Sequence, residues 1–210
     1  MKKFNFVLVS GILLVAISFA IFVQNFVFDY HAFISSGNTL QKIEDYLGSD
    51  DSKDSSNNST GKNGTIEKDA SFCFENSYME MPVYTVEEHS CIGFIHIPSI
   101  NCKLPIINEF SYDNLNYSPC RYFGSAYQKN LVIAAHNYLS HFGYLQNLNV
   151  GDKVYFTDIY NNEFVYKVAL LEILTPQDVE EMCSGEWDLT LFTCTYGGQF
   201  RTTVRCELIS

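Results

Sequence analysis

Three residue types capable of peptide-bond chemistry fall at or near the ends of predicted strands in the C-terminal part of the chain. Cys194 ends the apolar run DLTLFTC, and His136 ends the run NLVIAAH. A thiol that attacks an amide needs a route to the thiolate, a proton donor for the leaving amine and positive charge near the developing oxyanion. Cys194, His136 and an arginine from the last predicted strand would supply all three if these strand ends share one rim.

That arginine has two candidates, Arg201 and Arg205. They are four residues apart on one predicted strand, so strand alternation puts both side chains on the same face. Arg201 lies nearer the turn that follows Cys194 and is therefore expected to be the closer of the two. Taken singly, each residue also has an ordinary structural interpretation: a strand-end histidine can cap its neighbours, and a cysteine can be buried or disulfide-bonded. The elements that position them must therefore be read as well.

The first 28 residues contain the clearest physical signal in the chain. After Lys2 and Lys3 no charged residue occurs before Asp29, and residues 6–23 are apolar apart from three small residues. A helix of that length rises roughly 27 Å, about the thickness of a bilayer core. The two lysines predict a single-pass anchor with the N-terminus in the cytoplasm and the rest of the chain outside. A cleaved signal peptide is the alternative, but the apolar run exceeds the usual length of about 7–15 residues.

Composition excludes some classes of function and leaves others open. The formal net charge of −11 argues against nucleic-acid binding, because phosphate contacts need clustered Lys and Arg. The seven cysteines form no CxxC pair and no Cys/His cluster with zinc spacing, and Asp152 and Asp158 lack calcium-loop spacing. We therefore predict no metal and no cofactor. An odd number of cysteines leaves at least one thiol free within the chain, and the sequence does not choose a disulfide pattern.

Three segments follow from these patterns. Residues 1–28 are the cytoplasmic start and the transmembrane anchor, and residues 29–70 are a juxtamembrane segment and a polar linker. Residues 49–65 of that linker are almost purely Ser, Asp, Asn, Lys, Gly and Thr, which predicts a flexible tether. Residues 71–210 form the remaining domain, which is long enough to bury a single core.

The domain is predicted to consist mostly of strands. Short apolar or alternating runs cover residues 91–97, 101–107, 130–136, 151–158, 163–174, 188–194 and 199–208. Helical signals are short and lie at residues 141–148 and 176–182. Many short strands with few helices favour a closed or half-open β-barrel.

Taken in order, these segments resemble the sortases, the membrane-anchored cysteine transpeptidases of Gram-positive bacteria. Residues 92–100 and 104–106 resemble the family's opening strands, and residues 130–136 resemble the strand that delivers its catalytic histidine. Residues 142–154 fit the pattern F-x-x-L-x-x-L-x-x-G-D-x-V. Residues 190–194 match T-L-x-T-C, the most specific of these motifs, and Arg201 is the best match to the family's arginine.

The resemblance implies the eight-stranded sortase β-barrel and a cysteine transpeptidase. Cys194 would cleave an LPXTG-like sorting signal between Thr and Gly through a thioester acyl-enzyme. His136 would protonate the leaving amine and later deprotonate the incoming one, and Arg201 would hold the substrate carbonyl and the oxyanion. Thr193 is expected to bind substrate through a further hydrogen bond, or else to pack. The implied partners are secreted proteins with a C-terminal sorting signal and an amine of a peptidoglycan precursor or a pilin lysine.

Some points stay open at this level. Residues 175–187 carry only a short helix signal, which favours a class D-like or unclassified sortase over a class B-like one. Arg205 is expected to be structural or surface-exposed, and His141 to be a solvated residue at a helix start. Two other functions compete. One is another cell-wall cysteine hydrolase or an L,D-transpeptidase, although the latter place Ser-His-Gly before the cysteine, where this chain has Phe192-Thr193. The other is a non-catalytic surface-binding domain stapled by disulfides.

Overall fold

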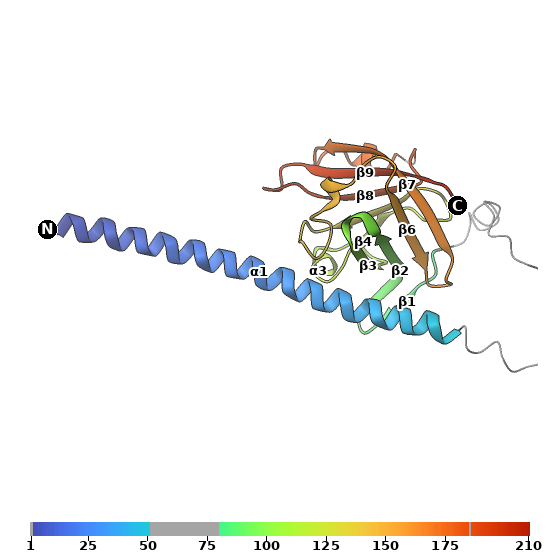
Figure 1. The fold of residues 1–210 in the computed structure, drawn as a ribbon, viewed down its shortest axis with the longest axis horizontal. Helices are drawn as coiled ribbons and strands as arrows, with labels where there is room; N and C mark the ends of the chain where they lie inside the picture. The colour runs from blue at the N-terminus through green and yellow to red at the C-terminus, as the bar shows by residue number, and fades with distance from the viewer. Residues whose placement is uncertain (1, 51–79, 185) are drawn as a thin grey trace, which may run out of the picture.

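The computed structural model describes residues 2–50, 80–184 and 186–210, and it consists of a β-barrel with one long helix lying against it (Figure 1). The helices of this part of the chain are α1 (Lys2–Asp50), α3 (Tyr112–Leu115), α4 (Val179–Met182) and the 3-10 turns η1 (Pro98–Ile100) and η2 (Leu145–Asn147). The strands are β1 (Tyr84–Val86), β2 (His89–Ile97), β3 (Cys102–Ile107), β4 (Cys120–Phe123), β5 (Leu131–Ala135), β6 (Lys153–Asp158), β7 (Glu163–Leu174), β8 (Leu189–Cys194) and β9 (Arg201–Leu208).

The strands form one sheet that closes on itself. Their order is β1-β2-β3-β4-β5-β8-β9-β7-β6, and β2 also pairs with β6. This last pairing joins β2 to β9 into an eight-stranded barrel, while β1 only forms a short hairpin with β2. The predicted fold, an eight-stranded sortase-type barrel, is confirmed.

Closure of the barrel depends on a glycine. Gly93 on β2 faces Asp158 on β6 and has a φ of 146°, which side chains rarely adopt. A Cβ atom at this position would lie 2.0 Å from the carbonyl oxygen of Thr157. Only a residue without a side chain lets β2 and β6 approach this closely, so Gly93 is a condition for the closed barrel.

Apolar side chains fill the interior, as the alternating strand patterns predict. Fully buried members include Ile92, Ile95, Leu131, Phe156 and Val204, from four different strands. All five residues of β5 are buried, because its inner face lies in this core and its outer face is covered by other segments. A strand buried on both faces is therefore the rigid support from which the next residue, His136, leaves the barrel.

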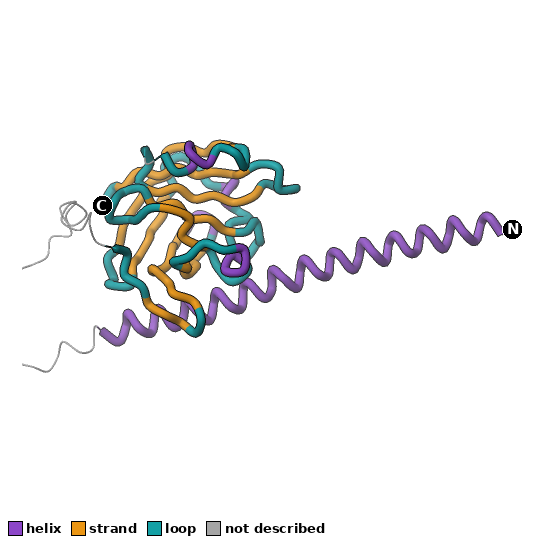
Figure 2. Tube along the Cα trace, turned by 180° about the vertical axis from the view of Figure 1, so that it is seen from behind, coloured by secondary structure: helices purple, strands orange, loops and turns teal. Residues whose placement is uncertain are grey.

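Helix α1 has two halves with different surroundings (Figures 1 and 2). Its N-terminal half is exposed and apolar, and the helix is long and apolar enough to cross a membrane. Its C-terminal half lies along the barrel, where Ile43 is fully buried and Lys42 forms an ion pair of 2.5 Å with Glu87. Tyr46 stacks on Tyr84 with ring centroids 4.2 Å apart. The predicted boundary at Asp29 therefore falls within one continuous helix, of which residues 29–50 form an outer layer of the barrel.

All seven predicted strands are present, with bounds that shift by at most two residues. Strands β1 and β4 were not predicted from the sequence, because runs of three and four residues give too little alternation to recognise. The predicted helix at residues 141–148 is wrong beyond a single 3-10 turn at Leu145–Asn147. The predicted flexible tether falls almost wholly on residues 51–79, which lie outside the described part of the chain, as does the predicted start of the domain at residue 71.

Candidate active site

Three neighbouring strands bring the predicted site residues together. Strands β5 and β8 are parallel and in register, with Ala135 opposite Thr193. His136 and Cys194 each follow one residue later, at the same end of two strands whose spacing is about 4.8 Å. On the other side of β8, Cys194 is the register partner of Arg201 on β9. The thiol thus lies between the imidazole and the guanidinium in the order of the sheet.

All three side chains line one groove of ≈ 290 Å³. Ala134 and Phe192 line it as well, two residues before His136 and Cys194, because side chains on a strand alternate between faces. The groove therefore runs over the outer face of β5 and β8 rather than into the barrel interior. Its further walls come from two segments that contain none of the predicted site residues. They are residues 110–115 with Tyr122, and residues 175–182.

The wall formed by residues 110–122 is aromatic. Phe110 contacts Tyr122 edge-on at 4.9 Å between ring centroids, and Tyr122 contacts Phe192 edge-on at 5.1 Å. Edge-to-face aromatic pairs of this kind are favourable and hold the rings in fixed orientations. Sequence reasoning missed these wall residues, because Phe110 lies in an irregular segment and Tyr122 in the short strand β4.

The environment of His136 sets its charge. Burial lowers the pKa of the His136 imidazole from its usual value, so the neutral form is favoured at pH 7. The ring lies 4.7 Å from the ring of Tyr138, centroid to centroid. A neutral imidazole beside a thiol can accept a proton, which is the role needed when the sulfur becomes a nucleophile.

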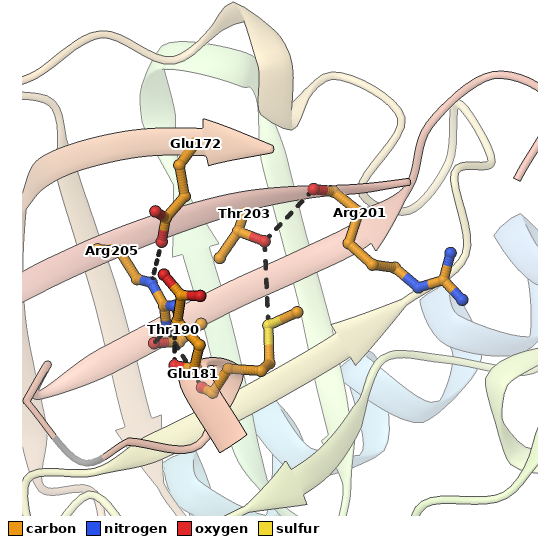
Figure 3. A network of polar contacts seen from close by, with 7 residues as sticks. Glu172, Glu181, Thr190, Arg201, Thr203 and Arg205 are labelled. Atoms are coloured by element: carbon orange, nitrogen blue, oxygen red, sulfur yellow. Dashed lines mark hydrogen bonds and ion pairs between the residues drawn. The ribbon is translucent and has the colours of Figure 1, made fainter. Parts of the chain in front are cut away.

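The two arginines of β9 differ in what they contact (Figure 3). Arg201 donates from Nη1 to the carbonyl oxygens of Gly198 and Phe200, each at 3.1 Å, and is half-buried beside the groove. No described carboxylate forms an ion pair with it. Its guanidinium points away from the other polar groups in this view and retains donors that a ligand in the groove could use.

Arg205 is 1% exposed and its guanidinium is fully engaged. It pairs with Glu172 at 2.6 Å, bonds the Thr190 hydroxyl at 3.0 Å and donates to the carbonyl oxygens of Glu181 and Met182. The helix α4 covers this part of the outer face of β9, which is why Arg205 is buried and Arg201 is not. Arg205 was expected to be either structural or surface-exposed, and its burial and hydrogen bonds show the structural role.

Thr193 stands on the opposite face from Cys194. It is buried, and its hydroxyl donates to the carbonyl oxygen of Ala135 at 2.9 Å. It is not among the described residues that line the groove. The bond joins β5 to β8 directly before His136 and Cys194, so it fixes the separation of the two strands at the site.

His141 does not occupy the place expected for it. It is 2% exposed rather than solvated, because α1 and the loop before it cover the ring, and it lines a second groove beneath α1. Burial lowers its pKa to about 4, and the neighbouring His136 acts in the same direction. The error has a physical cause: the segment that buries His141 lies more than 100 residues earlier in the chain.

The described cysteines are all unpaired, and most are inert. Burial raises the pKa of the thiols of Cys91, Cys102 and Cys120 to about 12 and raises that of Cys206 as well. Within residues 2–50, 80–184 and 186–210 no three His, Cys, Asp or Glu side chains gather as a metal site would require. Asp158, one of the acids considered for a cation, caps the β6–β7 turn by accepting bonds from the Tyr127 hydroxyl and three groups of residues 160–162.

Comparison with known proteins agrees with this geometry. Residues 95–209 match the model of the Sortase domain. Sortase A of Bacillus anthracis is 29% identical over 138 residues, a match that spans 60% of this chain and 62% of the length of that relative. Among solved structures, a Sortase D5 transpeptidase of Clostridium perfringens superposes with a TM-score of 0.58 at 20% identity, covering 84% of this chain and 99% of that one. A C. perfringens sortase C with a C-terminal cell wall sorting motif gives 0.52 at 28% identity, with 69% and 87% covered.

The fold and the groove define a β-barrel protein with a half-buried thiol between an imidazole and a guanidinium that forms no ion pair with a described carboxylate. Because the family model matches more than half of its length, the chain belongs to the sortase family, whose members are cysteine transpeptidases.

Proposed function

We propose that this chain is a sorting transpeptidase, with Cys194 as nucleophile, His136 as acid and base, and Arg201 as the group that binds the oxyanion. The observation that carries the proposal is the adjacency of these residues at the ends of β5, β8 and β9, where all three line one groove. No other described cysteine lines that groove.

The reaction proceeds in two halves. In the first, Cys194 transfers its proton to the neutral His136 and its sulfur attacks the carbonyl carbon of the Thr–Gly bond in an LPXTG-like signal. Arg201 stabilises the oxyanion of the tetrahedral intermediate. The imidazolium of His136 then protonates the leaving glycine amine, and a thioester remains on Cys194.

In the second half an amine takes the place of the leaving group. The incoming amine attacks the thioester carbon, His136 accepts the proton from its nitrogen, and the sulfur leaves as a thiolate that regains that proton. The net change is exchange of one amide for another, so no oxidant, metal or nucleotide is consumed. We propose a peptidoglycan precursor or a pilin lysine as the source of the amine.

The substrate side of the proposal has two supports. A peptide strand fits a groove with aromatic walls, since Phe110, Tyr122 and Phe192 offer apolar contacts to the residues before the scissile bond. The C. perfringens sortase C, 28% identical, is described with a C-terminal cell wall sorting motif. We propose a class D-like or unclassified sortase rather than a class B-like one, because the segment before β8 carries only the four-residue helix α4.

We also propose that α1 anchors the protein in the cell membrane as a single pass, with the barrel on the extracellular side. The apolar N-terminal half of α1 and the two lysines that precede it support this topology. Secreted proteins would then meet the enzyme as they emerge.

Intact-protein mass spectrometry tests the reaction. The protein is incubated with a panel of LPXTG-like peptides, with and without glycine-based and lysine amines, and the protein and peptide masses are followed. We expect a protein mass increase equal to the peptide up to its threonine, lost on addition of the amine as a new peptide–amine product appears. The Cys183→Ala variant is the matched control for loss of Cys194 and should react like the parent protein. Cys183 is half-buried, as Cys194 is, but lies outside the groove.

The rival functions give different results. A hydrolase would release the free peptide acid whether or not an amine is present. A non-catalytic binding domain would retain the peptide without any mass increase and would not react with a thiol-directed electrophile at Cys194. Either result would contradict the transpeptidase proposal.

A further inference from the structure

The contacts between α1 and the barrel fix which end of the barrel is nearest to the apolar half of the helix. Asp29 accepts hydrogen bonds from the backbone N–H and the hydroxyl of Ser140, at 3.1 and 2.5 Å. Further along the helix, Ser35 bonds the carbonyl of Tyr117, and Lys42 pairs with Glu87 only near the C-terminal end. The loop that contains Ser140 follows directly from His136, so the active-site end of the barrel is the end closest to the apolar segment.

The β8–β9 turn leaves the barrel at the same end, because β5 and β8 are parallel and in register. Figures 1 and 2 both show this turn directed toward the N-terminal side of α1. The opposite end of the barrel carries the β6–β7 turn with Tyr160, since β7 runs antiparallel to β9 and its Leu174 end pairs with Arg201. The two ends of the barrel are therefore distinguishable by sequence position.

Helix geometry sets the height of the active-site end above the apolar segment. Asp29 lies six positions after Val23, the last residue of the continuous apolar run, and six steps of 1.5 Å span about 9 Å. The headgroup layer on each side of a bilayer core is roughly 5–8 Å thick. A helix that crosses the membrane up to Val23 thus holds the Ser140 loop at the level of the headgroups or just above them.

Side chains at this end match that environment. Tyr196, at the tip of the β8–β9 turn, is 91% exposed, and Leu139 of the Ser140 loop is 57% exposed. Tyr144 and Phe200 are also exposed. Aromatic side chains with a polar edge are favourable at a membrane–water interface and cost free energy in bulk water.

We propose that a membrane-facing surface, formed by Leu139, Tyr144, Tyr196 and Phe200, lies in the headgroup layer of the bilayer that α1 crosses. The groove with Cys194 then opens at the bilayer surface and receives peptides and amines presented there. The partner is the lipid surface itself, contacted through aromatic and aliphatic side chains. Attraction to anionic lipids is not the cause, because the chain carries a net charge of −11. The inference rests on the proposed membrane anchor and not on the transpeptidase reaction.

Depth-dependent quenching of tryptophan fluorescence tests this surface. The chain has a single tryptophan, Trp187, which is replaced by Phe; a new tryptophan is then introduced as Tyr196→Trp or, as the matched control, Tyr160→Trp. Tyr160 is 62% exposed and lies in the turn at the opposite end of the barrel. Each full-length variant is reconstituted into phosphatidylcholine vesicles that contain a lipid with a quencher near the headgroup.

We expect the Tyr196→Trp variant to be quenched several-fold more strongly than the Tyr160→Trp variant, with its emission shifted to shorter wavelength. Phe200→Trp provides a second position at the same end and should behave like Tyr196→Trp. Equal quenching at both ends, or stronger quenching at position 160, would overturn the inference. Because quenching does not require catalysis, a protein that fails to transfer peptides can still pass this test, and an active protein can fail it.

Discussion

Two regions of the molecule use the same three residue types in opposite ways. The groove contains one cysteine, one histidine and one arginine at strand ends, and the buried layers of the barrel contain the same three residue types within twelve positions of them along the chain. The groove set is His136, Cys194 and Arg201, and the buried set is His141, Cys206 and Arg205. The difference teaches that residue type alone does not mark a reactive site in this chain.

Position along the strand explains the contrast. A side chain just past a strand end is supported on one side by the sheet and is open to water and ligand on the other. A side chain further along the same strand is covered, as Arg205 is by α4 and Cys206 by the barrel core. On β9, Arg201 retains donors that a ligand could use, whereas Arg205, four residues later, uses its donors within the protein.

The largest effect should come from the thiols. Cys194→Ala removes the nucleophile, and we expect it to reduce peptide transfer to the background rate while leaving the thermal unfolding temperature nearly unchanged. Cys206→Ala in the core should keep the activity per folded molecule and lower the free energy of unfolding by about 1 kcal/mol. Transfer assays and denaturant titrations measure both quantities, and residual activity in Cys194→Ala would contradict the assignment of the nucleophile.

The arginines should separate activity from stability. Arg201→Ala is expected to raise the activation barrier by about 2–4 kcal/mol, as loss of an oxyanion donor does, and to leave the free energy of unfolding almost unchanged. Arg205→Ala leaves Glu172 and two carbonyl groups without their donor and should lower the free energy of unfolding by about 3 kcal/mol. If Arg205→Ala abolishes activity in a stable protein and Arg201→Ala is mild, the roles must be exchanged.

His141 should make the free energy of unfolding depend on pH. His141 has a pKa of about 4 in the folded protein and about 6.5 when unfolded, so between these values only the unfolded chain binds the proton. The stability contribution is therefore complete above pH 6.5 and is lost as the pH falls toward 4, by about 3 kcal/mol at most. Asp29 opposes part of this loss, because its charge raises the pKa of His141.

His141→Phe removes that titration and keeps the site apolar. We expect the free energy of unfolding, measured by urea titration between pH 4 and pH 7, to depend less steeply on pH in this variant than in the parent protein. His136 also has a lowered pKa and contributes a residual slope of the same sign. An unchanged slope in His141→Phe would show that His141 is not buried in its neutral form.

The smallest effect concerns the hydrogen bond that spaces strands β5 and β8. Thr193→Val removes the hydroxyl that donates to Ala135, which should lower the free energy of unfolding by about 1 kcal/mol. Transfer activity should fall by less than tenfold, because His136 and Cys194 keep their strands. Thr203→Val is the control, since its hydroxyl makes only long contacts, 3.5 Å to the Arg201 carbonyl and 3.9 Å to the Met182 sulfur. A much larger activity loss with an unchanged KM would favour direct contact of Thr193 with the reacting groups.

Much of the barrel could be predicted from the chain, because strands of five or more residues carry an apolar or alternating pattern locally. Strand β4 was missed for lack of length, and with it Tyr122 of the groove wall. His141 was predicted to be a solvated residue at a helix start, and only packing against α1 removes it from water.

The sequence by itself determined the strand ends that deliver His136 and Cys194, and the pattern that puts Arg201 and Arg205 on one face, since both follow from a two-residue period. Only the tertiary structure decided which arginine stays free and which end of the barrel lies beside the apolar helix. Those choices depend on burial by distant segments: α4 covers Arg205, and Asp29 bonds Ser140 across 111 positions of the chain. No local pattern encodes a contact of that length, because its free energy appears only once the chain has folded.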